Sequence, residues 1–212
     1  MTDTTTSQER RLEVFAVVLL ALAALSTAWA SYQSARWRSE QAQAQTRATA
    51  SRVESTRASD LANGQTEVDV ATFIQWVDAR AHNEVELAGF YETRFRDEFV
   101  PAFEAWIATD PFANPDAQLT PFALPDYQLA AAEESEQLET KAEAASADAR
   151  EDIQRADNYV LSVVLFAAAL FFAGISTKLA TAKGRAAILG LGWVVYLGAV
   201  IWIATFPVSV EV

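Results

Sequence analysis

The sequence predicts an all-α membrane protein with three transmembrane helices and an extracytoplasmic helical stalk and head between helices 1 and 2. Two observations lead to this prediction. Uncharged apolar runs occupy residues 14–35, 158–177 and 186–206, and each is about 20 residues long, enough to cross a hydrocarbon core as a helix. The segment between the first two runs, residues 36–157, is polar but rich in helix-forming residues. It is therefore expected to form one α-helical domain.

Basic residues in short segments determine the expected topology, because Lys and Arg in short loops stay on the cytoplasmic side. The topology-determining residues are Arg10, Arg11, Lys178, Lys183 and Arg185. They place the polar tail 1–13, which we expect to lack regular structure, and the loop 178–185 in the cytoplasm. The domain 36–157 and the tail 207–212 then lie outside it.

The first apolar run has two interpretations. Ala28-Trp29-Ala30 resembles the cleavage site of a signal peptide. The run is longer than a typical signal core, and Trp29, Tyr32 and Trp37 are typical of an interfacial aromatic belt. An uncleaved anchor helix is the favoured interpretation.

The net charge of −12 is concentrated outside the apolar runs. Residues 36–157 contain 11 basic and 24 acidic residues. An acidic surface argues against nucleic acid as a partner. Solubility explains such a charge, while calcium and cationic partners stay open as alternatives. The chain has no cysteine, which excludes disulfides and thiolate chemistry.

The first long helix is expected to continue from the membrane to about Ala62, where Asn63-Gly64 predicts a turn. Small residues at heptad spacing predict its packing face. These are Ala35, Ser39, Ala42, Thr46, Thr49, Val53 and Thr56.

Aromatic residues dominate the next part of the chain. Helices are expected at 66–81 and 84–98, with a break near His82, and a short helix is expected after Pro101, which suits a first helical turn. Residues 110–126 contain four prolines and predict an irregular loop.

Residues 127–157 return to a helix that leads without a break into the second apolar run. Its expected packing face is Leu138, Ala142, Ala145, Ala149, Ile153, Ala156 and Val160. Two long helices with small faces predict an antiparallel, coiled-coil-like stalk.

A candidate interaction patch lies in the aromatic segment. It consists of Arg94, Phe95, Arg96, Phe99, Phe103 and Trp106. Aromatic residues with arginine are typical of docking sites, but the same spacing suits a small domain core with surface ion pairs. Spacing alone does not separate the two interpretations.

No catalytic, cofactor-binding or metal site is predicted, and no cofactor is expected. His82 stands alone at an expected turn, and the acidic run from Glu133 to Glu143 suits a solvated helix face better than an ion site. Neither a phosphate-binding glycine loop nor a hydrolase motif occurs. The chain is therefore expected not to be an enzyme.

The apolar runs contain no charged residue, which argues against a transporter or pump. A pore between subunits stays open, with Ser26 and Thr27 or Ser176 and Thr177 as its polar groups. Close packing of membrane helices, within or between subunits, is favoured by small residues four apart. Such pairs are Ala24/Ala28, Ala169/Ala173 and Ala186/Gly190.

Several segments together resemble an uncharacterised family of bacterial three-transmembrane-helix proteins, known as a domain of unknown function. They are AWASYQSARW, RFRDEFVPAFEAWIATDPFANP, ADNYVLSVVLFAAALFFAGIST and the basic turn that follows. The resemblance covers nearly the whole chain. It implies a multi-pass protein of the bacterial cell (inner) membrane with this topology, and it implies no activity.

Three hypotheses for function follow. The first is a non-enzymatic, self-associating scaffold or accessory subunit, whose partners are the lipid bilayer, further copies of the chain and another envelope protein. The second is a homo-oligomeric channel or pore. The third is a small-ligand sensor or an enzyme that uses a pocket around Arg94, Arg96 and Trp106.

Overall fold

The computed structural model describes residues 2–209, with side chains from Glu9 onward. It contains five α-helices and one 3-10 turn in these residues, and no strand. The elements are α1 (Thr2–Ala81), α2 (Val85–Glu92), α3 (Val100–Ile107), η1 (Pro121–Ala123), α4 (Ala130–Ser176) and α5 (Ala182–Ile203). The predicted all-α class is confirmed.

The three predicted apolar runs lie in α1, α4 and α5. Each of these helices contains a stretch long and apolar enough to cross a membrane. The described residues therefore contain three candidate membrane spans.

The chain divides into two compact units, and α1 and α4 run through both. The three-helix unit comprises the residues up to Thr46 and those from Ala145 on. The head unit is Arg47–Ala144. The head unit carries 7 basic and 19 acidic residues, so its net charge of −12 equals that of the whole chain.

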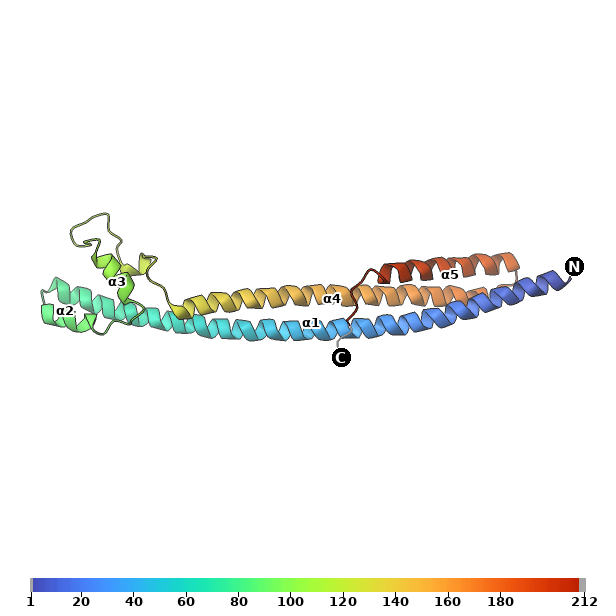
Figure 1. Ribbon diagram of the computed structural model, residues 1–212, viewed down its shortest axis with the longest axis horizontal. Coiled ribbons are helices and arrows are strands. Elements are labelled where there is room, and N and C mark those ends of the chain that lie inside the picture. Colours follow the sequence, from blue (N-terminus) through green and yellow to red (C-terminus); the bar gives the residue numbers. More distant parts are fainter. Residues whose placement is uncertain (1, 210–212) are drawn as a thin grey trace. The chain divides into compact units, whose positions relative to one another are not determined.

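Helices α1, α4 and α5 lie side by side in the three-helix unit (Figure 1). Small residues such as Ala23 and Ala169 are fully buried between them, together with Leu19 and Phe166. A Cβ atom at Gly192 would come within 3.1 Å of Leu19 and 3.2 Å of Phe172. Glycine at this position therefore allows α5 to approach its neighbours closely.

Helix α1 is continuous, which corrects two predictions. Thr2–Glu13 are helical rather than irregular, and Asn63-Gly64 lies inside the helix rather than in a turn. Both turn-forming residues are exposed, while Ala58 and Ala62 are buried on the same helix. Glycine within a helix costs about 1 kcal/mol relative to alanine, and packing of the neighbouring turns outweighs that preference.

The predicted packing face of α1 is wrong by two positions. Every residue predicted for it, from Ala35 to Thr56, is exposed. The buried residues are instead Trp37, Ala44, Ala48, Ser55 and Ala58. Two residues turn a helix by about 200°, so the contact lies on nearly the opposite side. Small residues occur on both sides of this stretch, and their spacing alone could not separate them.

The packing face predicted for α4 is largely confirmed. Ala142, Ala149 and Ala156 are buried, whereas Val160 is 38% exposed. In the head unit, the Ser55 hydroxyl donates to the Ser135 carbonyl at 3.0 Å, and Ser135 returns a hydrogen bond to the Ser55 carbonyl at 3.1 Å. Small side chains thus let α1 and α4 approach closely enough for hydrogen bonds across their contact.

In the head unit, the helix break predicted at the end of α1 is confirmed, but one predicted helix is longer than the observed one. The helix ends at Ala81 as expected, and Asn83 adopts a positive φ of 60°, which asparagine tolerates better than most residues. The expected helix 84–98 is shorter, since α2 ends at Glu92. Pro101 lies in the first turn of α3, as predicted, and residues 110–126 are irregular except for η1.

Candidate functional site

An aromatic core holds the head unit together. Phe73 and Trp76 of α1 meet Phe103 and Trp106 of α3, with ring centres 5.2 Å apart for Phe73–Trp106 and 4.9 Å for Trp76–Phe103. Most of these pairs are edge-to-face, a favoured geometry for aromatic rings. The core is completed by Phe95, Phe99, Phe122 and Tyr127.

Two tryptophans also form polar contacts from this core. The indole N–H of Trp76 donates to Glu92 Oε1 at 2.8 Å, which attaches the end of α2. The indole N–H of Trp106 donates to the Gln118 carbonyl at 2.7 Å, which attaches the proline-rich loop. The proline-rich loop is therefore held by the aromatic core, to which its own residues Phe122 and Leu124 contribute.

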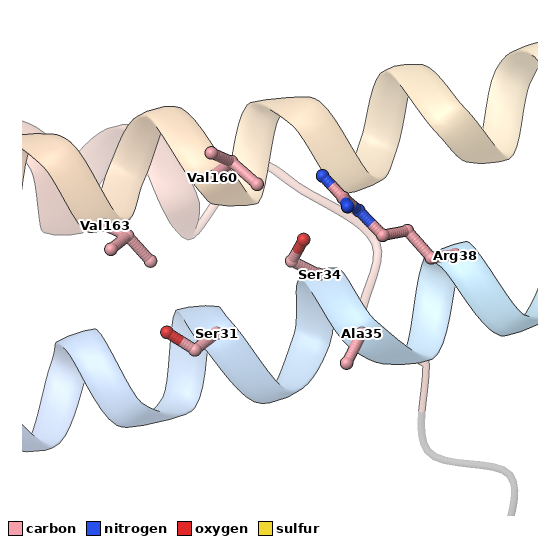
Figure 2. A pocket seen from close by; sticks show the side chains of 6 residues that line it. All are labelled: Ser31, Ser34, Ala35, Arg38, Val160 and Val163. Atoms are coloured by element: carbon pink, nitrogen blue, oxygen red, sulfur yellow. The ribbon is translucent and has the colours of Figure 1, made fainter.

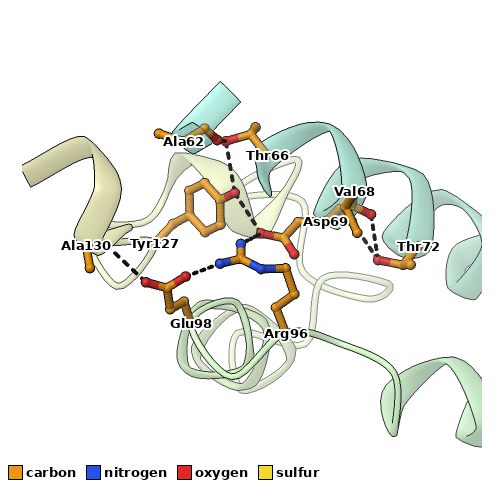
Figure 3. Close-up of polar contacts among 9 residues, drawn as sticks. All are labelled: Ala62, Thr66, Val68, Asp69, Thr72, Arg96, Glu98, Tyr127 and Ala130. Atoms are coloured by element: carbon orange, nitrogen blue, oxygen red, sulfur yellow. Dashed lines mark hydrogen bonds and ion pairs between the residues drawn. The ribbon is translucent and has the colours of Figure 1, made fainter. Parts of the chain in front are cut away.

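A buried polar network lies beside the aromatic core (Figure 3). Asp69 of α1 is fully buried, and its Oδ2 accepts hydrogen bonds from Arg96 Nη1 at 2.9 Å and from the Tyr127 hydroxyl at 3.0 Å. Arg96 also pairs with Glu98, whose Oε1 accepts from the Ala130 amide at 3.1 Å. The network joins α1, the segment before α3 and the first residue of α4.

Burial determines the protonation behaviour of this network. It raises the pKa of Asp69 above its ordinary value, although the hydrogen bond from Tyr127 and the Arg96 charge act in the opposite direction. Burial likewise raises the pKa of Tyr127, which keeps the phenol protonated as a donor. Asp69 Oδ1 has no hydrogen-bond partner among the described residues. Arg96 therefore compensates a carboxylate that is costly to bury.

The structure separates the six residues of the predicted interaction patch. Phe95, Phe99, Phe103 and Trp106 are buried in the aromatic core, and Arg96 belongs to the polar network. Arg94 is exposed, with its guanidinium 5.1 Å from the centre of the Phe90 ring. The patch is thus mostly the core of the head unit, and Arg94 is its most accessible member.

Other apolar residues of the head unit are exposed instead. Leu119 in the proline-rich loop is 93% exposed, and Phe112 in the same loop is 63% exposed. Phe112 still contacts Trp76 and Trp106, with ring centres 6.3 Å and 6.0 Å away. Leu119 lies almost entirely free of neighbours.

The residues considered for acid–base or metal chemistry lie apart. His82 is exposed, with its Nδ1 2.9 Å from the Asp78 carbonyl oxygen. That hydrogen bond and the Asp78 carboxylate raise the pKa of His82. The acidic run from Glu133 to Glu143 is exposed along α4. In the described part of the chain, no three His, Asp or Glu side chains gather as a metal site.

The polar residues considered for a pore make contacts within the three-helix unit. Ser26 Oγ lies 3.2 Å from the Tyr196 hydroxyl, and the Thr27 hydroxyl donates to the Ala23 carbonyl at 2.7 Å. Ser176 is buried and donates to the Ala173 carbonyl, while Thr177 donates to the Gly174 carbonyl. These hydroxyls are satisfied by their own chain.

The basic residues gather at one end of the three-helix unit. Arg185 in the first turn of α5 lies 3.6 Å from Glu13 of α1, measured between Nη2 and Oε1. Lys178 lies in the turn after α4, and Lys183 lies in the first turn of α5, which begins four residues before the predicted run. Arg10 and Arg11 line a surface hollow with Val14 and Phe15.

The sequence analysis missed the contacts that hold the C-terminal segment. Gln33 of α1 is fully buried and hydrogen bonds to the backbone of Ser209. The Tyr159 hydroxyl of α4 donates to the Pro207 carbonyl at 3.0 Å. The sequence signal for these contacts was Gln33 itself, because a polar amide buried within an apolar run needs hydrogen-bond partners.

Comparisons of the chain with family models, with curated proteins and with solved structures find no match.

Proposed function

We propose that the chain is a three-span protein of the bacterial cell membrane that acts as a non-enzymatic interaction protein, either a self-associating scaffold or an accessory subunit. Its N-terminus is cytoplasmic and residues 36–157 lie outside the cytoplasm. The grouping of the basic residues of α1 and α5 at one end of the three-helix unit supports this orientation. The family resemblance of the sequence supports the bacterial membrane.

The observation that carries the proposal is the exposure of Leu119. A leucine that is 93% exposed lies in an acidic unit in which most aromatic residues form a core. It follows Trp106 and Gln118 in a loop that the Trp106 hydrogen bond holds in place. Phe112 in the same loop is 63% exposed, so the loop presents two large apolar side chains that a protein partner can cover.

Self-association is supported by small residues outside the three-helix core. Ala24 and Ala28 of α1 are exposed, and so are Ala186 and Gly190 of α5. Each pair has the four-residue spacing that lets membrane helices approach closely. Ala169 and Ala173, by contrast, are buried within one chain.

The channel hypothesis has less support, because its expected polar groups are satisfied within one chain. Ser26 contacts Tyr196, and the hydroxyls of Thr27, Ser176 and Thr177 bind the backbone of their own helices. Near Arg96, the structure offers the sensor or enzyme hypothesis a surface hollow lined by Phe95, Arg96, Asp97 and Glu98.

The experiment that tests the proposal has two parts. A photo-crosslinking amino acid is placed at Leu119 and, as a control, at Val68, which is 52% exposed on α1 in the same unit. We expect specific crosslinks in intact membranes from position 119 and fewer from position 68. Equal crosslinking at both positions, or none at position 119, counts against a docking loop.

Light scattering of the full chain in mild detergent then separates the two forms of the proposal. A defined multiple of the chain mass supports the scaffold. A single-chain mass, with a crosslink at position 119 to a different protein, supports the accessory subunit. A single-chain mass with no crosslink contradicts both.

A further inference from the structure

A groove between α1 and α4 lies at one end of the apolar part of the three-helix unit (Figure 2). It has a volume of about 310 Å³. Its lining residues are Ser31, Ser34, Ala35 and Arg38 of α1 and Val160 and Val163 of α4. In Figure 2, Arg38 extends from α1 towards α4 and Val163 extends from α4 towards α1. The groove thus has a cationic end and an apolar wall.

The position of the groove along the helices coincides with the end of the apolar runs. Asp157 is the last charged residue of α4 before its run, and Arg36 is the first charged residue of α1 after its own. Ser31 and Arg38 are separated by about 10 Å along the helix axis. The groove therefore crosses the boundary at which lipid acyl chains meet headgroups.

Arg38 and Asp157 face each other without a close contact. Arg38 Nη2 lies 3.9 Å from Asp157 Oδ1, and the two side chains are 57% and 67% exposed. This distance is longer than a hydrogen bond. A guanidinium has five N–H donors, so Arg38 can bind a further acceptor while its carboxylate neighbour stays nearby.

The other arginines near this level, Arg36 and Arg155, have side chains that are 27% and 30% exposed, against 57% for Arg38. Arg155 binds Asp152 at 3.0 Å, pairs with Glu151, and lies 4.6 Å from the centre of the Trp37 ring. Arg36 lies 3.8 Å from Glu40. Arg38 is therefore the accessible cation that lines the groove, and the exposed Asp157 carboxylate lies beside it.

We propose that this groove binds a phospholipid with a zwitterionic headgroup bearing a primary ammonium, as in phosphatidylethanolamine. Its phosphate binds Arg38, its ammonium binds Asp157, and one acyl chain lies along Val160 and Val163. The hydroxyls of Ser31 and Ser34 donate to oxygens of the phosphate or the glycerol esters. A purely anionic headgroup fits less well, because it has the same phosphate but no ammonium to offset the Asp157 carboxylate beside it.

This assignment requires α1 and α4 to span the membrane, as proposed above, but does not require the chain to have a protein partner. It concerns the lipid-facing side of the three-helix unit rather than the head unit. Failure of the lipid experiment would therefore leave the interaction proposal intact, and the reverse also holds.

The test uses the full chain, delipidated in mild detergent, and native mass spectrometry with added phosphatidylethanolamine, phosphatidylglycerol or inorganic phosphate. We expect phosphatidylethanolamine to bind the wild type more tightly than phosphatidylglycerol, and inorganic phosphate not to compete. Arg38→Gln and Asp157→Asn should each weaken phosphatidylethanolamine binding by roughly tenfold, as for the loss of one charge-assisted hydrogen bond. Arg150→Gln and Asp148→Asn remove equivalent exposed charges from α4 and should leave binding unchanged.

A third variant keeps the test decisive if the charge variants fold poorly. Ser31→Leu keeps both charges and narrows the groove, and it should also reduce binding. Equal affinity for both lipids would overturn the zwitterionic assignment, and competition by inorganic phosphate would indicate a free-ion site instead. Unchanged binding in Ser31→Leu together with either charge variant would overturn the site itself.

Discussion

Gln33 and Ser209 are joined by two hydrogen bonds. Gln33 Nε2 donates to the Ser209 carbonyl at 3.3 Å, and Gln33 Oε1 accepts from the Ser209 amide at 3.1 Å. The glutamine therefore satisfies one donor and one acceptor of an irregular backbone segment, as a neighbouring strand would. This matters because unpaired backbone groups near lipid are costly.

Gln33→Leu removes both of these bonds and should release the segment after α5. Each hydrogen bond contributes about 1 kcal/mol net, so we expect a loss of about 2 kcal/mol in the free energy of unfolding. Hydrogen exchange at Val208 and Ser209 in detergent should rise in the same variant. Gln43→Leu, an exposed position on the same helix, is the control. Equal exchange in both variants would mean that Gln33 does not hold the segment.

Arg96→Met leaves Asp69 buried without its cation. Removing one partner of a buried ion pair typically costs about 3 kcal/mol or more, and we expect a loss of that size at pH 7 in denaturant unfolding of the full chain. Arg94→Met is the control, since Arg94 is exposed over Phe90 and should change stability by less than about 1 kcal/mol. A similar loss in both variants would contradict the role of the network.

The stability loss caused by Arg96→Met should change with pH in a defined direction. Burial raises the pKa of Asp69 above 3.8, so the folded state binds more protons than the unfolded state between 3.8 and the folded pKa. The contribution of Asp69 to stability is then most favourable below 3.8 and declines as the pH rises through the folded pKa. Loss of Arg96 raises that pKa further, so the deficit of Arg96→Met should shrink on acidification. A stability loss that grows at acid pH would contradict a raised pKa of Asp69 in the folded state.

Leucine substitutions at Ala44 and Ala42 test which face of α1 packs on α4. Ala44 is fully buried, and overpacking a tight helix contact costs roughly 1–3 kcal/mol. Ala42 is exposed two residues earlier, so Ala42→Leu should change thermal stability little. Thermal unfolding followed by circular dichroism compares the two. The reverse order of stability would restore the face predicted from sequence.

Gly192 and Gly190 form a matched pair on α5. Added atoms at Gly192 meet Leu19 and Phe172, whereas nothing lies within 4 Å of a Cβ at Gly190. Gly192→Leu should therefore lower the thermal midpoint in detergent by several degrees, and Gly190→Leu should leave the monomer unchanged. If Gly190 mediates self-association, its variant should lower the mass measured by light scattering instead. Equal thermal midpoints would contradict the close approach of α5.

Single cysteines at Ser59 and Thr181 test the orientation in the membrane. The chain has no native cysteine, so each variant has one reactive thiol. An impermeant thiol reagent applied to intact cells should label position 59 and not position 181. Labelling of position 181 with protection of position 59 would invert the proposed topology.

The amino-acid sequence by itself determined the three apolar helices, the break at His82–Asn83, the place of Pro101 in the first turn of α3 and most of the packing face of α4. Each depends on a local rule: the length of an apolar run, the backbone preference of asparagine, or the fixed φ of proline. In residues 130–157, Leu138 and Ile153 mark the packing face of α4 with the large apolar side chains of that stretch.

Only the tertiary structure decided which side of α1 is buried and which aromatic residues form a core. Ala42 and Ala44 are chemically alike, so their neighbours alone distinguish them. Asn63-Gly64 would favour a turn in isolation, but the packed turns on both sides keep it helical. Asp69, Arg96 and Glu98 come together, as do Gln33 and Ser209, because residues distant in sequence satisfy one another's charges and hydrogen bonds, which no local pattern encodes.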